Sequence, residues 1–167
     1  IVVETETPFC INGRLSFHKR ILEAIPNKVK TTSVDSFLNR SFDKNDKPKV
    51  IVGRLKKEYQ HLIEDAILFM KSKLGMEYDN VFLANNNKYY CSELIYEAFK
   101  EDTIFKLHPM TFLHPENNDT LDIWRDYYSK LKMEIPEKKL GINPGIMSIS
   151  DKIDIVHVYG TPDGMQE

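Results

Sequence analysis

Hydrophobic side chains recur at helical spacing through residues 57–74. The apolar positions in this segment are Tyr59, Leu62, Ile63, Ala66, Ile67, Met70 and Leu74. Apolar residues separated by three or four positions form one face of an amphipathic helix. Gly75 comes directly after the last of them, and glycine readily adopts the positive φ that ends a helix. The pattern therefore predicts a helix over residues 57–74 that ends at Gly75.

A second helical pattern begins at Cys91, inside the stretch K-Y-Y-C-S-E-L-I-Y-E-A-F that covers residues 88–99. Its apolar positions are Cys91, Leu94, Ile95, Ala98 and Phe99. The three asparagines at 85–87 are typical of a loop and of a helix cap. We therefore expect Cys91 to lie in the first turn of a helix, on the side that faces the core or a cleft.

The remaining segments alternate between strand-like and helix-like patterns. Strands are expected at residues 1–7, 15–24, 49–55 and 153–159. Helices are expected at residues 31–40, with Ser33 as a candidate cap, and at residues 120–131. Asn12-Gly13 indicates a turn between the first two strands, and residues 134–150 are expected to form a loop. We expect one α+β domain over residues 1–167, since no internal repeat interrupts the pattern.

Composition narrows the class of protein. The chain has 167 residues, of which 41% are hydrophobic and 29% charged, with a formal net charge of -2. Such a chain can bury a core, and neither charge sign dominates enough to favour nucleic acid or an anionic membrane surface. No apolar run is long enough to span a membrane. Two cysteines do not form a disulfide framework, although a single Cys10–Cys91 bridge stays open.

Cys91 is the first candidate for chemistry. A helix N-terminus carries partial positive charge and stabilises a thiolate, which is the nucleophilic form of cysteine. Burial in the core is the alternative, because free cysteine is among the most buried residue types. Cys10 lies in a loop-like stretch without a helix beside it, and we expect it to be inert.

A cysteine hydrolase also needs a base close to the thiol. The five histidines of the chain are His18, His61, His108, His114 and His157. His61 lies on the predicted long helix and is expected to be a surface residue. His157 lies in the last strand, downstream of the cysteine helix as in papain-like enzymes of ordinary chain order. His18 precedes Glu23 and is a candidate substitute base, so the residue pattern alone leaves the base open.

No other chemistry is favoured by the motifs. The chain has no paired Cys-x-x-Cys, no His-x-x-x-His and no glycine-rich phosphate loop, so we expect no metal and no cofactor. The aromatic residues between Trp124 and Tyr128 fall at helical spacing and are more typical of a core than of a stacking platform.

Four segments in order resemble the YiiX/YebB-like hydrolases, a permuted papain-like branch of the NlpC cysteine-hydrolase superfamily. They are the Y-Y-C-S-E-L-I-Y-E-A-F motif, I-L-E-A-I-P-N-K-V followed by T-T-S-V-D-S-F-L, V-G-R-L-K, and G-M-E-Y-D-N-V-F. I-N-P-G at 142–145 is similar to a subgroup. The resemblance implies a circularly permuted papain-like fold in which an antiparallel sheet packs on helices and the histidine strand precedes the cysteine helix.

The resemblance also implies residue roles. Cys91 would be the nucleophile, and Glu23, in the Leu-Glu-Ala strand, would orient the catalytic histidine. That histidine lies in a His-x-Gly-type segment directly before a run like I-V-V-E, so we expect it upstream of Ile1 and regard the chain as truncated there. Tyr90 is a candidate oxyanion donor, with packing beside the helix as its alternative. Tyr78 and Asp79 are candidate substrate-binding residues, although an ordinary turn explains them equally well.

The function implied is hydrolysis of an amide or ester bond through an acyl-enzyme on Cys91. The substrate is expected to be a peptide, a cell-wall fragment or a small lipid-like molecule. The alternatives are a lipid acyl hydrolase or acyltransferase and an inactive binding domain that keeps the fold. Family members are often bacterial and exported, which suggests the cell envelope or periplasm, while the natural substrate and oligomeric state stay open.

Overall fold

The structure is a computed structural model that describes residues 2–5, 9–11, 14–16, 19–42, 46 and 49–160. Its strands are β1 (Val2–Thr5), β2 (Phe9–Ile11), β3 (Arg14–Ser16), β4 (Lys19–Ile25), β5 (Lys28–Ser33), β6 (Val50–Leu55), β7 (His108–Pro109), β8 (Leu140–Gly141) and β9 (Ile153–Tyr159). Its helices are α1 (Val34–Asn39), the 3₁₀ helix η1 (Lys57–Leu62), α2 (Ile63–Ser72), α3 (Cys91–Ala98), α4 (Asp122–Leu131) and α5 (Pro144–Ser148). Antiparallel strands and helices mix as the α+β prediction requires.

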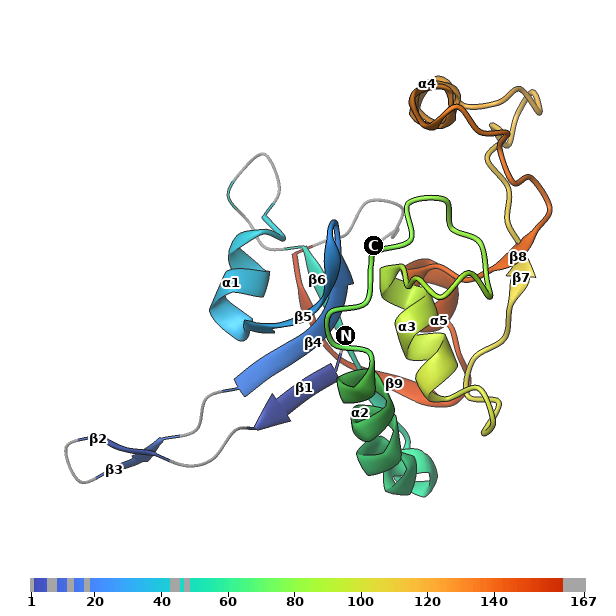
Figure 1. The fold of residues 1–167 in the computed structure, drawn as a ribbon. Helices are drawn as coiled ribbons and strands as arrows, with labels where there is room; N and C mark the ends of the chain where they lie inside the picture. Colours follow the sequence, from blue (N-terminus) through green and yellow to red (C-terminus); the bar gives the residue numbers. More distant parts are fainter. Residues whose placement is uncertain are drawn as a thin grey trace.

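A three-stranded antiparallel sheet forms the centre of the molecule, with β4 between β1 and β5 (Figure 1). Val2 pairs with Leu22, which confirms the predicted hairpin. β2 and β3, which lie between β1 and β4 in the sequence, pair with each other. The predicted turn residues Asn12-Gly13 lie outside the described residues. β6 and β9 form a separate antiparallel pair, and β9 has the bounds predicted from the sequence.

Helices α2 and α3 pack on one face of the central sheet. Leu22 and Ala24 of β4, with Val29 of β5, form a buried cluster with Met70 of α2 and Leu94 of α3. Alternate residues of a strand point to opposite faces, so Leu22 and Ala24 share the face that meets these helices. Burial of this apolar surface fixes α3 against β4 and thereby places the start of α3 beside the sheet.

The segment after α2 continues the sheet. Helix α2 ends at Ser72 with Lys73 as its C-cap, before the predicted end at Leu74, and Gly75 follows in the turn with φ of +87°. The chain then runs alongside β5, where Met76 accepts a hydrogen bond from the Val29 N–H at 2.8 Å and the Tyr78 N–H donates to Asn27 at 3.2 Å. These backbone hydrogen bonds therefore hold the segment up to Tyr78 alongside the sheet.

Three local predictions were wrong. Thr31 to Ser33 belong to β5 rather than to a helix, although Ser33 does cap α1 by accepting a hydrogen bond from the Ser36 N–H. The first turns of the predicted long helix form the 3₁₀ helix η1. The predicted loop at 134–150 contains β8 and α5, where Asn143 is the N-cap and Pro144 the first helical residue.

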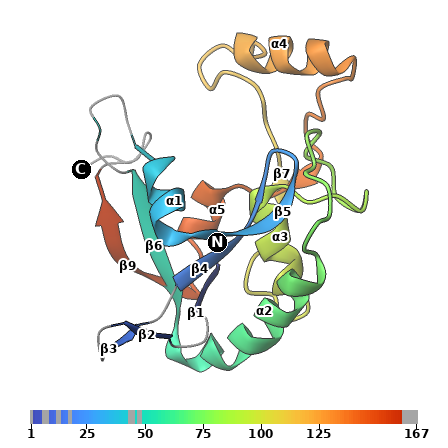
Figure 2. The same cartoon turned by 60° about the vertical axis from the view of Figure 1, so that its left-hand side comes forward.

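Helix α4 stands away from the central sheet on an arm, residues 110–139, that leaves and returns through β7 and β8 (Figure 2). The two strands pair antiparallel, with His108 opposite Gly141 and Pro109 opposite Leu140. The two ends of the arm therefore lie side by side, where β7 pairs with β8.

Candidate active site

Cys91 is the first residue of α3, as the sequence predicted. Its thiol is a free cysteine of intermediate burial, so it is neither fully exposed nor sealed in the core. The first N–H groups of a helix have no partner inside the helix and carry partial positive charge. This position favours a thiolate and offers the Cys91 N–H to a developing oxyanion.

The start of α3 is organised by Glu93 rather than by the asparagines before it. Tyr90 is the N-cap, and its N–H donates to the Glu93 carboxylate at 3.3 Å. Glu93 is buried, and this burial raises its pKa to about 8. Asn85 and Asn87 form part of the loop, as expected, with positive φ that asparagine tolerates.

The Tyr90 side chain is buried and lies against a segment from the end of the chain. Its hydroxyl accepts a hydrogen bond from the Ile142 N–H at 3.2 Å, and Ser92 donates to the Ile142 carbonyl at 2.8 Å. Burial raises the pKa of Tyr90 to about 12, so the hydroxyl keeps its proton at neutral pH. These contacts favour a packing role for Tyr90, and its predicted role as an oxyanion donor stays a prediction.

Tyr78 lies beside the start of α3 because the backbone holds it there. It forms a parallel bridge with Tyr89, while the Asp79 N–H donates to Tyr89 and the Tyr89 N–H donates to Glu77. Burial raises the pKa of Tyr78 to about 12, and the charge of Cys91 is the largest electrostatic contribution after it. No hydrogen bond of the Tyr78 hydroxyl is found within the described residues, and the Tyr78 side chain packs on the cluster of Tyr90, Ile142 and Met147 next to the start of α3.

Asp79 is held inside a turn. It is completely buried, and its two carboxylate oxygens accept hydrogen bonds from the Val81 N–H at 2.8 Å and the Leu83 N–H at 2.7 Å. This arrangement is typical of a carboxylate that shapes a turn. The contacts favour the ordinary turn that was the alternative for Asp79, and its predicted role in substrate binding stays a prediction.

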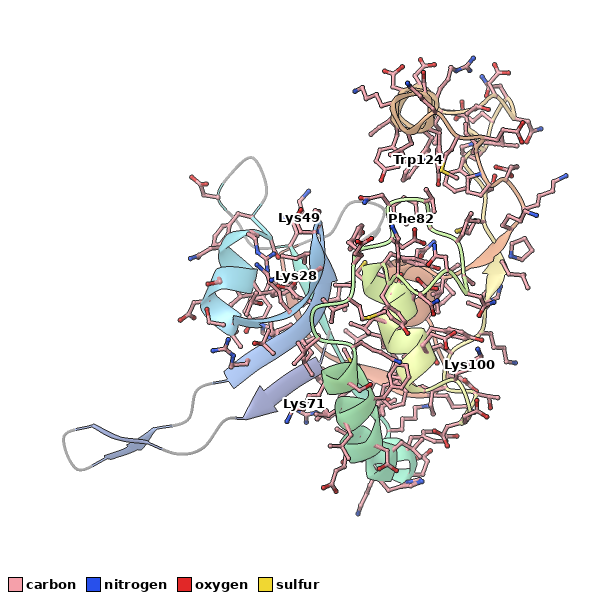
Figure 3. The ribbon with its side chains drawn as sticks, in the orientation of Figure 1. Lys28, Lys49, Lys71, Phe82, Lys100 and Trp124 are labelled. Atoms are coloured by element: carbon pink, nitrogen blue, oxygen red, sulfur yellow. The ribbon has the colours of Figure 1, made fainter. Side chains whose placement is uncertain are left out.

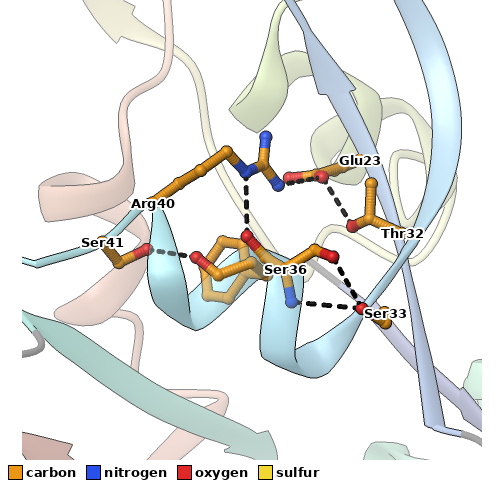
Figure 4. Close-up of polar contacts among 7 residues, drawn as sticks. Glu23, Thr32, Ser33, Ser36, Arg40 and Ser41 are labelled. Carbon is orange, nitrogen blue, oxygen red and sulfur yellow. Dashed lines mark hydrogen bonds and ion pairs between the residues drawn. The ribbon is translucent and has the colours of Figure 1, made fainter.

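Glu23 is buried and is held on the side of β4 that faces α1 (Figure 4). Its carboxylate accepts a hydrogen bond from Thr32 at 2.7 Å and forms an ion pair with Arg40, the C-cap of α1. Leu22 and Ala24, its neighbours along the strand, point instead to the face that meets α3. In the described part of the chain, therefore, no hydrogen bond joins Glu23 to Cys91, and its predicted orienting role stays a prediction.

The histidines after β4 do not pair with Cys91. His61 and His108 are exposed, and His114 accepts a hydrogen bond from the Glu116 N–H. His157 is exposed on β9, opposite Val52 of β6, with its ring 4.3 Å from that of Tyr159. No hydrogen bond to the Cys91 thiol comes from any of these four residues, which removes the support for His157 as the base. His18 and the side chain of Cys10 lie outside the described residues.

The sequence analysis missed Glu93 and Phe82. The Glu three residues after the N-cap is the spacing of a capping box, so this signal was present although a tyrosine replaces the usual Ser or Thr. Phe82 has φ of +56°, which is unfavourable for an aromatic residue, and its ring lies between Tyr90 and α4. No residue pattern marks such a position, because it depends on contacts that form only in the fold.

No group of three or more His, Cys, Asp and Glu side chains is placed to hold a metal ion within the residues that the structure describes. In the same residues, none of the helices has the length and apolar character needed to cross a membrane.

Residues 1–157 match the model of a family described as permuted papain-like amidase enzymes, YaeF/YiiX, C92 family. The fold is similar to the crystal structure of the metalloprotein yiiX from Escherichia coli O157:H7, with a TM-score of 0.68 and 17% sequence identity over 93% of this chain and 81% of that chain. No curated protein sequence matches significantly.

Proposed function

Because the chain belongs to the YaeF/YiiX family of permuted papain-like amidases, we propose that it is a cysteine hydrolase that cleaves an amide or ester bond through an acyl-enzyme on Cys91. The observation that carries the proposal is the position of Cys91 as a partly accessible first residue of α3, with two tyrosines beside it. The permuted papain-like fold of the family confirms the predicted fold class.

The proposed reaction has two steps. The Cys91 thiolate attacks the substrate carbonyl carbon, and the new C–S bond gives a tetrahedral intermediate with negative charge on oxygen. The C–N or C–O bond then breaks, and the leaving group takes the proton that the base removed from the thiol. Water attacks the resulting thioester with help from the same base, which releases the acid and restores the thiol.

Tyr78 is the side chain that we propose as oxyanion donor, together with the Cys91 N–H. Its free hydroxyl, its electrostatic interaction with Cys91 and its neutral state support this role. Tyr90 is the second candidate: its hydroxyl accepts a hydrogen bond from the Ile142 N–H, which leaves its own proton free to donate, but the side chain is buried against the Ile142 segment. The prediction that Tyr78 binds substrate is compatible with this role, because an oxyanion donor contacts the reacting carbonyl.

The base is proposed from the resemblance alone, as a histidine in the segment that leads into β1. Glu23 is proposed as the group that orients it. Its ion pair with Arg40 supports a fixed, ionised carboxylate, whereas its position on the α1 side of β4 favours a purely structural role. A variant of Glu23 therefore tests the proposed orienting role of this residue separately from the role of the nucleophile.

The test is acylation of the full-length natural protein with p-nitrophenyl acetate, in a Cys10→Ser background. We expect a burst of p-nitrophenol and an acetyl group on Cys91, located by mass spectrometry. Cys91→Ala should abolish both. At pH 7, iodoacetamide should also alkylate Cys91 at least about tenfold faster than free cysteine, because the helix terminus stabilises the thiolate.

A protein whose Cys91 reacts no faster than free cysteine and forms no acyl adduct contradicts the proposal. It would favour the inactive binding domain instead. Acylation by long-chain esters in preference to acetyl and peptide substrates would identify the lipid acyl hydrolase or acyltransferase.

A further inference from the structure

Residues 79–83, which we call the Asp79 turn, follow Tyr78 in the chain and contact helix α4 of the arm. The turn is held from inside by the Asp79 carboxylate, which binds the N–H groups of Val81 and Leu83. Its backbone is strained at Phe82, where φ is +56°. A non-glycine residue in this region is strained and persists only where surrounding contacts impose it.

The surrounding contacts come from α4. The Tyr127 hydroxyl donates to the Asn80 carbonyl at 2.8 Å, and the Tyr128 hydroxyl donates to the Val81 carbonyl at 3.1 Å. Tyr128 is almost completely buried, so its bond is shielded from water. Two hydroxyls from successive residues of one helix thus hold successive carbonyls of the Asp79 turn.

Aromatic packing fixes the same turn from both sides. The Phe82 ring stacks on Tyr127 with centroids 6.0 Å apart, and it meets Trp124 edge-on at 6.0 Å. On its other side it meets Tyr90, the residue before Cys91, edge-on at 5.5 Å. Figure 3 shows Trp124 on the side of α4 that faces the body, where Phe82 lies. Phe82 therefore bridges α4 and the start of α3.

We propose that α4 sets the position of Tyr78 for the acylation of Cys91, and that Tyr127 and Tyr128 are positioning residues for this step. The inference rests on the proposed function and on Tyr78 as oxyanion donor. Neither α4 residue contacts Cys91 among the described hydrogen bonds; both act through the Asp79 turn, whose first residue is bonded to Tyr89 and follows Tyr78 directly.

The double variant Tyr127→Phe/Tyr128→Phe removes the two hydroxyls and keeps the rings. We expect the rate of acylation by p-nitrophenyl acetate to fall at least about fivefold, since a displaced oxyanion donor loses much of its effect. Alkylation by iodoacetamide should stay within about twofold, because displacement of iodide by the thiolate develops no oxyanion. A merely structural loss would lower both rates together.

Tyr78→Phe gives the second arm of the experiment. By itself it should slow acylation by at least about tenfold and leave alkylation within about twofold. In the triple variant, the two α4 substitutions should add less than about twofold to this loss, because their effect requires the Tyr78 hydroxyl. Tyr59→Phe is the matched control: its ring lies under the Lys152 ammonium group, 5.2 Å away, in a different part of the fold, and loss of its hydroxyl should change neither rate.

The outcomes separate the two proposals. If the protein acylates Cys91 but the α4 double variant acylates at the unaltered rate, α4 is not a positioning element and the inference is overturned alone. If the losses from α4 and from Tyr78→Phe are independent and multiply, α4 does not act through Tyr78, which also overturns it. If the unaltered protein forms no acyl-Cys91, the proposed function fails and this inference fails with it.

Discussion

Single residues at the start of α3 combine structural and electrostatic roles. Glu93 completes the cap of the helix through the Tyr90 N–H, yet it is buried two residues from the proposed nucleophile. An ionised carboxylate there would oppose a thiolate, whereas a protonated one does not. The pKa of about 8 that burial imposes keeps most Glu93 side chains neutral at pH 7. Burial thus allows an acidic residue within a site that must stabilise negative charge.

Glu93→Gln should change how stability depends on pH. The pKa of Glu93 rises from 4.5 to about 8 on folding, so its contribution to stability is complete below the lower value and is lost as pH rises through the higher one. The unaltered protein should therefore lose more unfolding free energy between about pH 5 and about pH 8 than the variant, by up to a few kcal/mol. Denaturant unfolding at several pH values measures this.

The exposed residue Glu116 supplies the control, since Glu116→Gln should keep the pH dependence of the unaltered protein. Parallel stability curves for Glu93→Gln and the unaltered protein would show that Glu93 ionises at its ordinary pKa in the folded state.

At the scale of elements, the pairing of Glu23 with Arg40 fixes α1 against β4. α1 has no fully buried residue of its own, so this ion pair is its clearest anchor to the sheet. The Arg40 side chain is 44% exposed while that of Glu23 is 4% exposed. Loss of the arginine would therefore leave a buried carboxylate with Thr32 as its remaining described partner.

Arg40→Ala should lower the unfolding free energy by about 1–3 kcal/mol, because it leaves a buried charged acceptor without its partner. Arg125→Ala, which removes a pair between exposed side chains, should cost less than about 1 kcal/mol. In the double variant Glu23→Gln/Arg40→Ala the loss should be smaller than the sum of the single losses. Additive losses, measured by denaturant unfolding, would show that the two residues act independently.

At the scale of the molecule, the site is assembled from distant parts of the chain. The start of α3 is held by β4 on one side and by Ile142 on another, and the α4 arm reaches back to the Asp79 turn. The arm leaves the body where Gly141 crosses Met110. A Cβ on Gly141 would meet the Met110 side chain, whose sulfur and terminal methyl group would have to move aside.

Gly141→Ala should therefore lower the unfolding free energy by about 1–3 kcal/mol through overpacking at the base of the arm. Met110→Ala in the same chain should recover part of this loss, because it removes the atoms that the new Cβ meets. Thermal unfolding of the two single variants and the double variant measures the effect. A double variant that is less stable than Gly141→Ala would contradict the stated cause.

The sequence by itself determined the elements whose patterns are local. Three local predictions are confirmed, since spacing and caps act within a few residues: the helical stripe from Cys91 to Ala98, the cap at Ser33 and the last strand. The resemblance of four ordered segments predicted the family and the permuted fold, and both are confirmed. The roles assigned to Cys91, Glu23, Tyr78 and Tyr90 stay predictions.

Only the tertiary structure decided which side chains meet at Cys91. Asp79 and Tyr78 are adjacent in sequence, yet one is sealed inside a turn and the other lies beside the thiol, because strand pairing with Tyr89 sends them in different directions. Phe82 is held at a positive φ by contacts from α4, which follows some forty residues later. Local propensity carries no information on such contacts, since their energy depends on parts of the chain that meet only after folding.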